Sequence, residues 1–214
     1  VPGVTLSVVI VTWNSAADIG RCLASLRRAA GTRAVEVVVV DNASTDRTLE
    51  AVRAFPEARC VASPRNLGFA GGSNRGAEEA RGSVILLLNP DTEVAPEAIE
   101  RLLDRLEETS GRLAAVGPVL LNADGSTQSA GERFLTPREY LLRRVLLLPK
   151  PACKAEGPYP VEWASGACLA IRRAAWEAVG PLDESFFLYA EDMEWCWRAR
   201  RAGWRVEIGR ASCR

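Results

Sequence analysis

The sequence predicts an α/β fold in which a mostly parallel central sheet is flanked by helices. Short β-branched runs alternate with segments of helical periodicity through the first half of the chain, the order expected of parallel strands joined by crossover helices. The valine run that ends at Val40 lacks polar alternation, which is typical of a strand buried on both faces. With 214 residues, 48% of them hydrophobic and 25% charged, the chain has the size of one globular domain.

The strands of the first half are expected at residues 6–12, 35–40, 59–62 and 83–88. After the first strand, Asn14 or Ser15 can cap a helix that ends at Gly31. One face of this helix is apolar and carries Ile19, Cys22, Leu23 and Leu26.

Three more helices are expected between and after these strands. One covers residues 44–55, with Leu49 and Val52 pointing inward. The glycine-rich segment 66–76 leads into a helix that ends near Ala80. Pro96 occupies the first turn of the next helix, whose apolar stripe is Ile99, Leu102, Leu103 and Leu106.

Beyond residue 113 the alternation fades into a smaller mixed region. Residues 122–125 carry a hairpin signal, and residues 149–160 form a proline-rich connector. The last expected helix covers residues 191–202. Residues 209–214 have no strand or helix pattern and are expected to be a non-native or truncated tail.

Residues 138–148 combine basic and apolar side chains. Packing in the core is the favoured interpretation of this segment. A helix on a loop over the site, or a surface that contacts lipid, are the alternatives.

The composition excludes several classes of protein. The 27 basic and 27 acidic residues cancel, so the overall charge indicates neither a nucleic-acid partner nor a polybasic membrane anchor. Six cysteines without a C-x-x-C pair favour reduced thiols over a zinc site or a disulfide framework. No apolar run approaches the ~20 residues of a spanning helix, and no signal-type segment opens the chain, so a cytoplasmic protein is expected.

Polar residues that follow strands are candidates for ligand binding, because ligands of open α/β sheets bind beyond the carboxyl ends of the strands. Asp41 ends the valine run, where its carboxylate could accept the imide N–H of a uracil or thymine ring. Asp91 follows the strand at 83–88, where a divalent cation that bridges diphosphate oxygens needs an oxygen ligand. A turn residue is the alternative interpretation of each.

Glu191 and Asp192 open the last helix, where acidic residues commonly complement the helix dipole. The functional alternative is a general base that takes the proton from an acceptor hydroxyl as its oxygen attacks an anomeric carbon. A diphosphate leaving group needs no second carboxylic acid when a metal absorbs its charge, so one base and one metal carboxylate suffice.

Six stretches together resemble glycosyltransferase family 2, whose members have the GT-A fold. They are residues 7–14, 38–46, 66–76, 87–92, 165–167 and 189–192, the last followed by Arg198 and Gly203-Trp204. The chain is most similar to the bacterial branch that includes rhamnosyl- and galactofuranosyltransferases of cell-wall and surface polysaccharides. The resemblance implies one GT-A domain over residues 1–208, with a nucleotide-binding half at 1–112 and an acceptor half at 113–208.

The resemblance also implies an inverting transfer from a UDP- or dTDP-sugar, assisted by Mg²⁺ or Mn²⁺. The acceptor would be a glycan or a lipid-linked sugar, with peripheral contact at the inner face of the membrane as a further option. Asp91 would bind the metal, Asp192 would be the base with Glu191 beside it, and the acceptor would lie over Ser165, Gly166 and Ala167. The residues expected around the donor nucleotide are Thr12, Asn14, Asp41, Asn66, Gly68, Asn74 and Asn89.

Two features depart from the pattern of the family. The D-x-D motif begins with Asn89, so Asp91 is its only carboxylate, and the chain contains no histidine, although members of this branch usually carry one after the Glu-Asp helix. A catalytically silent nucleotide-sugar or glycan-binding module therefore stays open as the alternative. A sugar nucleotidyltransferase is disfavoured, because no glycine-rich loop with Arg and Lys follows the first strand.

Overall fold

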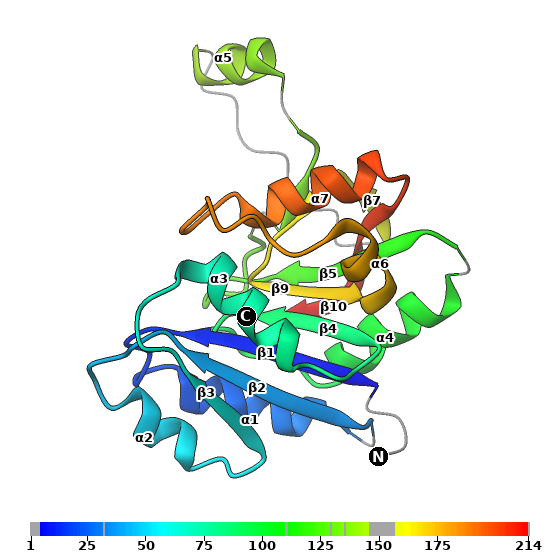
Figure 1. The fold of residues 1–214 in the computed structure, drawn as a ribbon. Helices are drawn as coiled ribbons and strands as arrows, with labels where there is room; N and C mark the ends of the chain where they lie inside the picture. Colours follow the sequence, from blue (N-terminus) through cyan, green and yellow to red (C-terminus); the bar gives the residue numbers. More distant parts are fainter. Residues whose placement is uncertain are drawn as a thin grey trace.

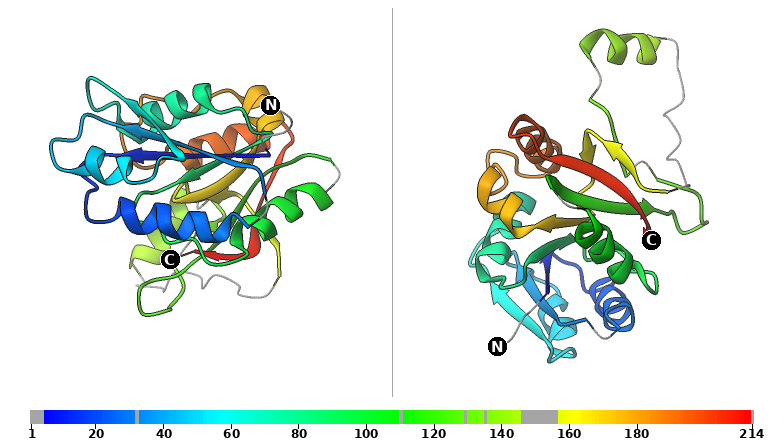
Figure 2. Two further views of the ribbon diagram at one scale, coloured as in Figure 1. Left: turned by 90° about the horizontal axis from the view of Figure 1, so that it is seen from below. Right: turned by 90° about the vertical axis from the view of Figure 1, so that its right-hand side faces the viewer.

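The computed structural model describes residues 5–31, 33–109, 111–128, 130–134, 136–145 and 157–213. In this part of the chain one eight-stranded sheet has the order β3-β2-β1-β4-β9-β5-β10-β7 (Figure 1). Helices α1 and α4 cover one face of the sheet, and α3, α6 and α7 cover the other (Figure 2). The predicted α/β class with a mostly parallel sheet is therefore confirmed.

The first half of the chain supplies the parallel strands β3, β2, β1 and β4. Thr12 lies opposite Asp41, and Ile10 lies opposite Leu88, so the carboxyl ends of β1, β2 and β4 meet at one edge. The elements of this half are β1 (Leu6–Thr12), α1 (Ile19–Ala29), β2 (Val35–Asp41), α2 (Thr48–Arg53), β3 (Ala58–Ala62), α3 (Gly68–Glu79), β4 (Val84–Leu88) and α4 (Ala98–Glu108).

The second half adds both parallel and antiparallel strands. β9 is antiparallel to β4 on one side and to β5 on the other, whereas β10 is parallel to β5. β6 and β8 form a separate two-stranded sheet. The elements are β5 (Leu113–Leu120), β6 (Gly131–Glu132), α5 (Pro137–Val145), β7 (Tyr159–Val161), β8 (Trp163–Ala164), β9 (Cys168–Arg172), α6 (Arg173–Val179), α7 (Glu191–Arg201) and β10 (Arg205–Cys213).

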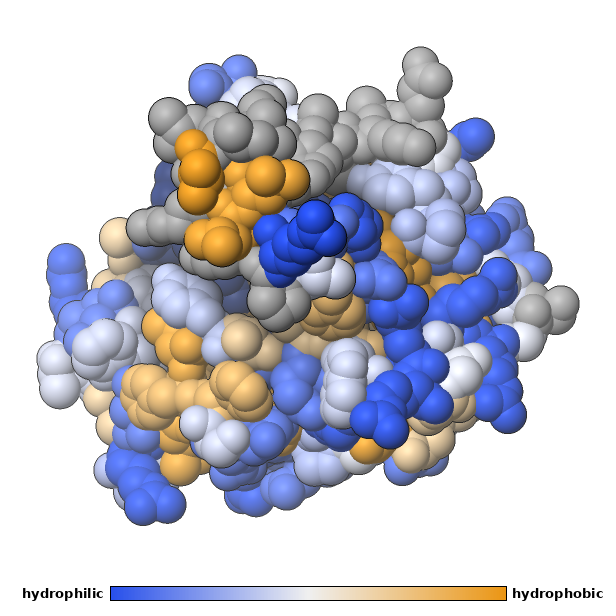
Figure 3. Space-filling view, turned by 90° about the horizontal axis from the view of Figure 1, so that it is seen from above, coloured by the Kyte–Doolittle hydropathy of each residue, from blue (hydrophilic) through white to orange (hydrophobic). Residues whose placement is uncertain are grey.

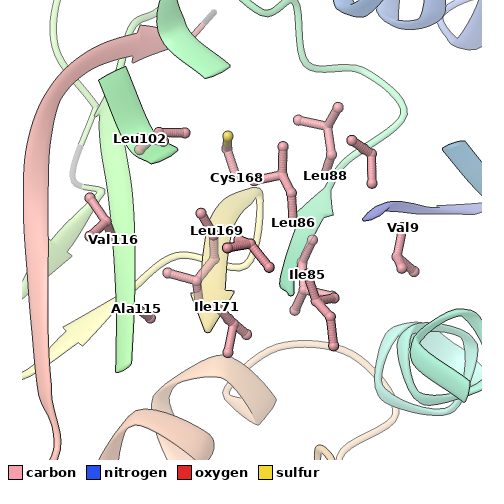
Figure 4. Packing of buried hydrophobic residues seen from close by; sticks show 14 of the residues in the cluster. Val9, Ile85, Leu86, Leu88, Leu102, Ala115, Val116, Cys168, Leu169 and Ile171 are labelled. Carbon is pink, nitrogen blue, oxygen red and sulfur yellow. The ribbon is translucent and has the colours of Figure 1, made fainter. Parts of the chain in front are cut away.

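Strand β9 joins the two halves into one hydrophobic core. Leu86 of β4, Leu169 of β9 and Val116 of β5 lie on neighbouring strands and are buried (Figure 4). Burying each large apolar side chain stabilises the fold by about 1.5–3 kcal/mol. The core therefore holds the first and second halves of the chain in one fixed arrangement.

Three predicted helix boundaries are wrong. α1 begins at Ile19, so Asp18 and not Asn14 or Ser15 occupies the N-cap position, and Ser15 Oγ accepts a hydrogen bond from Trp13 N. α2 is shorter than residues 44–55, because Thr45 N donates to Asn14 Oδ1 at 2.8 Å and belongs to the loop. Pro96 precedes its helix, since Glu97 at φ 63° is still left-handed.

The glycine-rich segment does not lead into α3 but forms most of it. A Cβ on Gly72 would lie 2.6 Å from Val11 Cγ1, and one on Gly76 would lie 2.3 Å from Val9 Cγ1. These glycines therefore let α3 pack closely against β1.

The expectation that residues 209–213 have no strand pattern is wrong, because β10 continues to Cys213. Ser212 pairs with Val119 and Cys213 pairs with Leu120, after an irregularity that follows Ile208. A strand had not been expected at residues 209–213, because Gly209, Ala211 and Ser212 have little β propensity. Backbone pairing with β5 determines the structure there.

The expectation that residues 138–148 pack in the core is wrong for the three apolar side chains that the structure describes in α5. Leu141, Leu142 and Val145 are 62%, 52% and 69% exposed. Residues 146–148, and the part of the proline-rich connector up to residue 156, lie outside the described residues. Among the helices of the described ranges, none has the length and apolar content needed to cross a membrane.

Candidate active site

Asp41 is buried at the shared edge of β1 and β2, and its carboxylate accepts three hydrogen bonds. Thr12 Oγ1 donates to Oδ1 at 3.1 Å, Ser44 Oγ donates to Oδ1 at 2.6 Å, and Ser44 N donates to Oδ2 at 3.1 Å. A carboxylate can accept about four hydrogen bonds, so these three leave the capacity of Asp41 for about one more. The structure thus brings Thr12 and Asp41 together as expected and gives Asp41 a role in the turn as well.

Asn14 connects the loops that follow β1 and β2. Its backbone N–H donates to Ser44 Oγ at 2.9 Å, and its side-chain Oδ1 accepts from Thr45 N at 2.8 Å. Asn14 has a φ of 52°, a left-handed conformation that asparagine tolerates better than most residues. Its position beside Trp13, which is 58% exposed, places it at the open rim of the sheet edge.

Asn66 and Gly68 form the turn at the start of α3. Asn66 Oδ1 accepts from Gly68 N at 2.9 Å, and Gly68 has a φ of +74°. A Cβ on Gly68 would lie only 2.3 Å from the carbonyl oxygen of Phe187, which accepts from Phe69 N at 2.9 Å. Glycine is needed here for both the backbone conformation and the close approach.

Asn42 is a polar residue of this region that the sequence prediction missed. The residue is 2% exposed and donates from Nδ2 to the carbonyl oxygen of Gly68 at 2.8 Å, whereas its Oδ1 has no hydrogen-bond partner among the described residues. The signal was its position directly after Asp41. A buried acceptor without a partner costs free energy unless water or a ligand satisfies it.

Asn74 is used for an internal connection. Its Oδ1 accepts from Leu182 N at 2.9 Å, and its Nδ2 donates to Leu182 O at 2.9 Å and to Glu184 Oε1 at 3.0 Å. These bonds fasten the loop before α7 to α3. The expected contact between Asn74 and a nucleoside therefore stays a prediction.

The loop after β4 carries Asn89 and the exposed Asp91. Asn89 N donates to Ala167 O at 2.9 Å, which connects this loop to the segment before β9. Burial, and next the charge of Asp91, raise the pKa of the Cys22 thiol to about 12, so Cys22 is a neutral group below the loop. Within the described ranges, no cluster of three or more His, Cys, Asp or Glu side chains could by itself hold a metal ion.

Asp192 lies in the first turn of α7 and receives two backbone amides. Gly166 N donates to its Oδ2 and Met193 N to its Oδ1, both at 2.7 Å. Burial raises the pKa of Asp192, and these amides, which stabilise the charged form, oppose that rise. The carboxylate is thus held in one orientation and is a stronger base than an exposed aspartate.

Glu191, beside it, is 4% exposed, and its Oε2 has no hydrogen-bond partner in the part of the chain that the structure describes. Burial raises the pKa of Glu191, a backbone hydrogen bond opposes this, and the charge of Asp192 raises it further. Two neighbouring acids with raised pKa values at one helix start are typical of functional sites.

The residues before α7 adopt strained conformations. Tyr189 and Ala190 have φ values of 71° and 75°. Left-handed residues other than glycine cost about 1–3 kcal/mol each and cluster at functional sites. The bonds from Phe69 N to Phe187 O and from Asn74 to Leu182 hold this backbone in place.

Gly166 and Ala167 connect the start of α7, which carries Asp192, to the loop after β4, which carries Asp91. Gly166 N contacts Asp192, and Ala167 O contacts Asn89. A Cβ on Gly166 would lie 3.1 Å from Phe69 Cε1, so the ring of Phe69, which the sequence prediction missed, also belongs to this neighbourhood. Of the expected acceptor residues, Ser165 turns its Oγ toward Ala167 N at 3.3 Å and shapes the loop.

Comparisons with known proteins identify the family and the fold of the chain. The family model described as glycosyl transferase family 2 matches residues 7–180. The chain is 34% identical over 208 residues to the low-salt glycan biosynthesis hexosyltransferase Agl10 of Haloferax volcanii, with 95% of this chain and 64% of that protein covered. It is 33% identical over 221 residues to the N-acetylglucosaminyl-diphospho-decaprenol L-rhamnosyltransferase of Mycobacterium tuberculosis, with 93% and 71% covered.

Two solved structures share the fold. GalNAc-T7 with UDP, GalNAc and Mn²⁺ superposes with a TM-score of 0.75 at 22% identity, with 99% of this chain and 44% of that chain covered. S. aureus TarS 1–349 in complex with UDP-GlcNAc gives a TM-score of 0.71 at 20% identity, with 95% and 55% covered. The chain thus spans 64% of the length of Agl10 and about half of these two chains.

Proposed function

The chain belongs to glycosyl transferase family 2 and has the GT-A fold, and from this premise we propose that it transfers a sugar from a nucleotide-diphosphate donor to a hydroxyl of a glycan or lipid-linked acceptor. One observation carries the proposal most directly. The carboxylate of Asp192 has a raised pKa and is fixed by the amide of Gly166, next to the loop that carries Asp91.

The proposed reaction is a single displacement with inversion. Asp192 takes the proton from the acceptor hydroxyl, the hydroxyl oxygen forms a bond to the anomeric carbon, and the bond from that carbon to the diphosphate oxygen breaks. The diphosphate leaves with the bonding electrons. A base whose pKa has been raised by burial binds that proton more tightly than an exposed aspartate does.

Asp91 can supply one carboxylate ligand to a divalent cation such as Mg²⁺ or Mn²⁺. Asp91 is exposed, and the described residues supply no cluster of three ligands, so donor oxygens and water would complete the coordination. When bound, the cation would neutralise charge on the diphosphate. Mn²⁺ in the structures of GalNAc-T7 and of the mannosyltransferase PcManGT supports this assignment.

The donor is proposed to be a UDP- or dTDP-sugar, and the acceptor a lipid-linked sugar in polysaccharide synthesis at the inner face of the membrane. Similarity to a rhamnosyltransferase named for a diphospho-decaprenol substrate supports the acceptor class. UDP in a TarS complex supports the nucleotide, although PcManGT, with the same fold, binds GDP-Man. The free position on Asp41 suits the imide N–H of a pyrimidine.

A thermal-shift screen tests the donor. UDP and dTDP with Mn²⁺ are expected to raise the melting temperature more than GDP, because a ligand that binds only the folded state stabilises it by mass action. An equal shift for all nucleotides, independent of Mn²⁺, would contradict pyrimidine selection and metal assistance.

Asp192→Asn tests the reaction. This change is expected to lower nucleotide release in the presence of acceptor by about a hundredfold or more, with donor affinity unchanged, because the base acts on the acceptor. Glu194→Gln is the matched control, since Glu194 lies in the same helical turn but is paired with Arg198 at 2.7 Å. Turnover of the Asp192 variant close to that of the parent would refute the assignment, and donor binding without release in the parent would support the silent binding module.

A further inference from the structure

Helix α5 exposes apolar side chains far from the rest of the molecule. Leu141, Leu142 and Val145 are 62%, 52% and 69% exposed. Two views show α5 projecting beyond the sheet and its covering helices (Figures 1 and 2). Scattered apolar residues at a surface are ordinary, but several on one short helix indicate an interaction surface.

The apolar residues of α5 occupy one face of the helix. Leu141, Leu142 and Val145 follow Arg138 at intervals of three, four and seven residues, the spacing of neighbours on one side of a helix. In Figure 3, which looks down on α5, hydrophobic residues of this region lie at the surface beside strongly hydrophilic ones. The outer side of α5 therefore carries these apolar side chains together with Arg138 one turn earlier.

The charge of α5 is positive. Its nine residues contain Arg138, Arg143 and Arg144 against a single acid, Glu139. Glu139 is itself paired with Arg133 at 2.5 Å. A basic helix with exposed apolar side chains complements a surface whose outer layer is negatively charged and whose interior is apolar.

We propose that α5 docks on the surface of an anionic lipid bilayer. This inference rests on the proposed function, because a lipid-linked acceptor presents its sugar at such a surface. Nine residues measure about 14 Å along a helix, less than half of the ~30 Å hydrocarbon core, so α5 lies in the plane of the interface. A second copy of the chain fits less well, because a two-fold contact through α5 would bring two arginine-rich helices together.

Sedimentation with vesicles tests the proposal. The parent is expected to bind vesicles of phosphatidylcholine with phosphatidylglycerol, and to bind pure phosphatidylcholine at least tenfold more weakly. Leu141→Ser with Leu142→Ser should reduce binding to the mixed vesicles on the order of tenfold, because apolar burial is lost. Arg138→Gln should reduce it roughly fivefold, and raised salt should shrink that difference.

Arg53→Gln on α2, a helix at the opposite end of the sheet, is the matched control and should bind like the parent. The proposal is overturned if the parent does not bind mixed vesicles at low salt, or if the double serine variant binds them as the parent does. It is also overturned if the double variant loses a dimer that the parent forms without lipid, since the occupant would then be a second copy.

A separate measurement distinguishes failure of the docking from failure of the proposed function. The double serine variant should keep the parent's melting temperature, its nucleotide affinity and its transfer to a water-soluble acceptor. A parent that binds vesicles but releases no nucleotide would retain the docking surface and contradict only the transfer reaction. Loss of nucleotide binding in the double variant would contradict a purely peripheral role for α5.

Discussion

The amide of Gly166 holds the proposed base, and the glycine leaves no room for a larger residue. A Cβ at this position would lie 3.1 Å from Phe69 Cε1 and 3.5 Å from Asp192 Cβ. The position of the Asp192 carboxylate therefore depends on the packing between Gly166 and an aromatic ring of α3. Small displacements of reacting groups can lower rates by large factors.

Gly166→Ala is expected to lower turnover by about tenfold or more and to cost roughly 1–3 kcal/mol of stability, because the added methyl displaces the Phe69 ring or the loop. Urea unfolding and nucleotide-release assays measure the two effects. Adding Phe69→Leu should recover part of the lost stability, since a smaller side chain yields space. If the double variant recovers no stability, the added methyl does not clash with the Phe69 ring.

Glu191 predicts a pH dependence of stability. Burial raises the pKa of its carboxyl above the ordinary 4.5 in the folded protein, so the folded state binds a proton more tightly than the unfolded state. The stabilisation that this tighter proton binding gives the folded state is fully present below pH 4.5. It is lost as the pH rises through the pKa of Glu191 in the folded protein. Deprotonation of the buried carboxyl as the pH rises above 4.5 therefore lowers the stability of the folded protein.

Glu191→Gln should therefore raise the melting temperature at pH 7 relative to the parent, and this difference should shrink as the pH falls toward 4.5. Calorimetric melts across that range provide the measurement, and Glu194→Gln, at a carboxylate that is paired with Arg198, is the control. A difference that is the same at all pH values would mean that the effect comes from packing and not from ionisation.

At the scale of elements, α3 owes its position to glycines that face β1. Gly76→Ala should destabilise the fold by about 1–3 kcal/mol in urea unfolding, because its Cβ would lie 2.3 Å from Val9 Cγ1. Gly20→Ala in α1 is the matched control. Nothing lies within 4 Å of its Cβ, so the change should be neutral or stabilise by up to about 1 kcal/mol. Equal effects of the two changes would contradict the close packing of α3.

The loop between α6 and α7 depends on the contacts made by Asn74. Asn74→Ala should lower the melting temperature and the transfer rate while nucleotide affinity stays within about twofold, because the side chain binds Leu182 and Glu184. Glu184→Gln, which alters only one of these bonds, should have a smaller effect. Titration with UDP distinguishes a structural role of Asn74 from a contact with the nucleoside. A large loss of UDP affinity in Asn74→Ala would favour the nucleoside contact expected from the sequence.

At the scale of the whole molecule, the site combines elements that are distant in the sequence. Asn89 comes from the first half of the chain, whereas Ala167, Gly166 and Asp192 come from the second half. β9 lies between β4 and β5 and brings these halves together. The proposed base and the proposed metal carboxylate are thus positioned by one sheet.

The sequence by itself determined the α/β class, the first four strands and the apolar faces of α1 and α4, because burial on one or both faces of an element leaves a local period. It also indicated Asp41, Asp91 and Asp192, since each lies at the end of an element. Only the tertiary structure decided the antiparallel insertion of β9, the extension of β10 to Cys213, the exposure of α5, and the partners of Asn74 and Asp192. These features depend on pairings between residues that are far apart in the chain, and such pairings leave no local period from which they could be predicted.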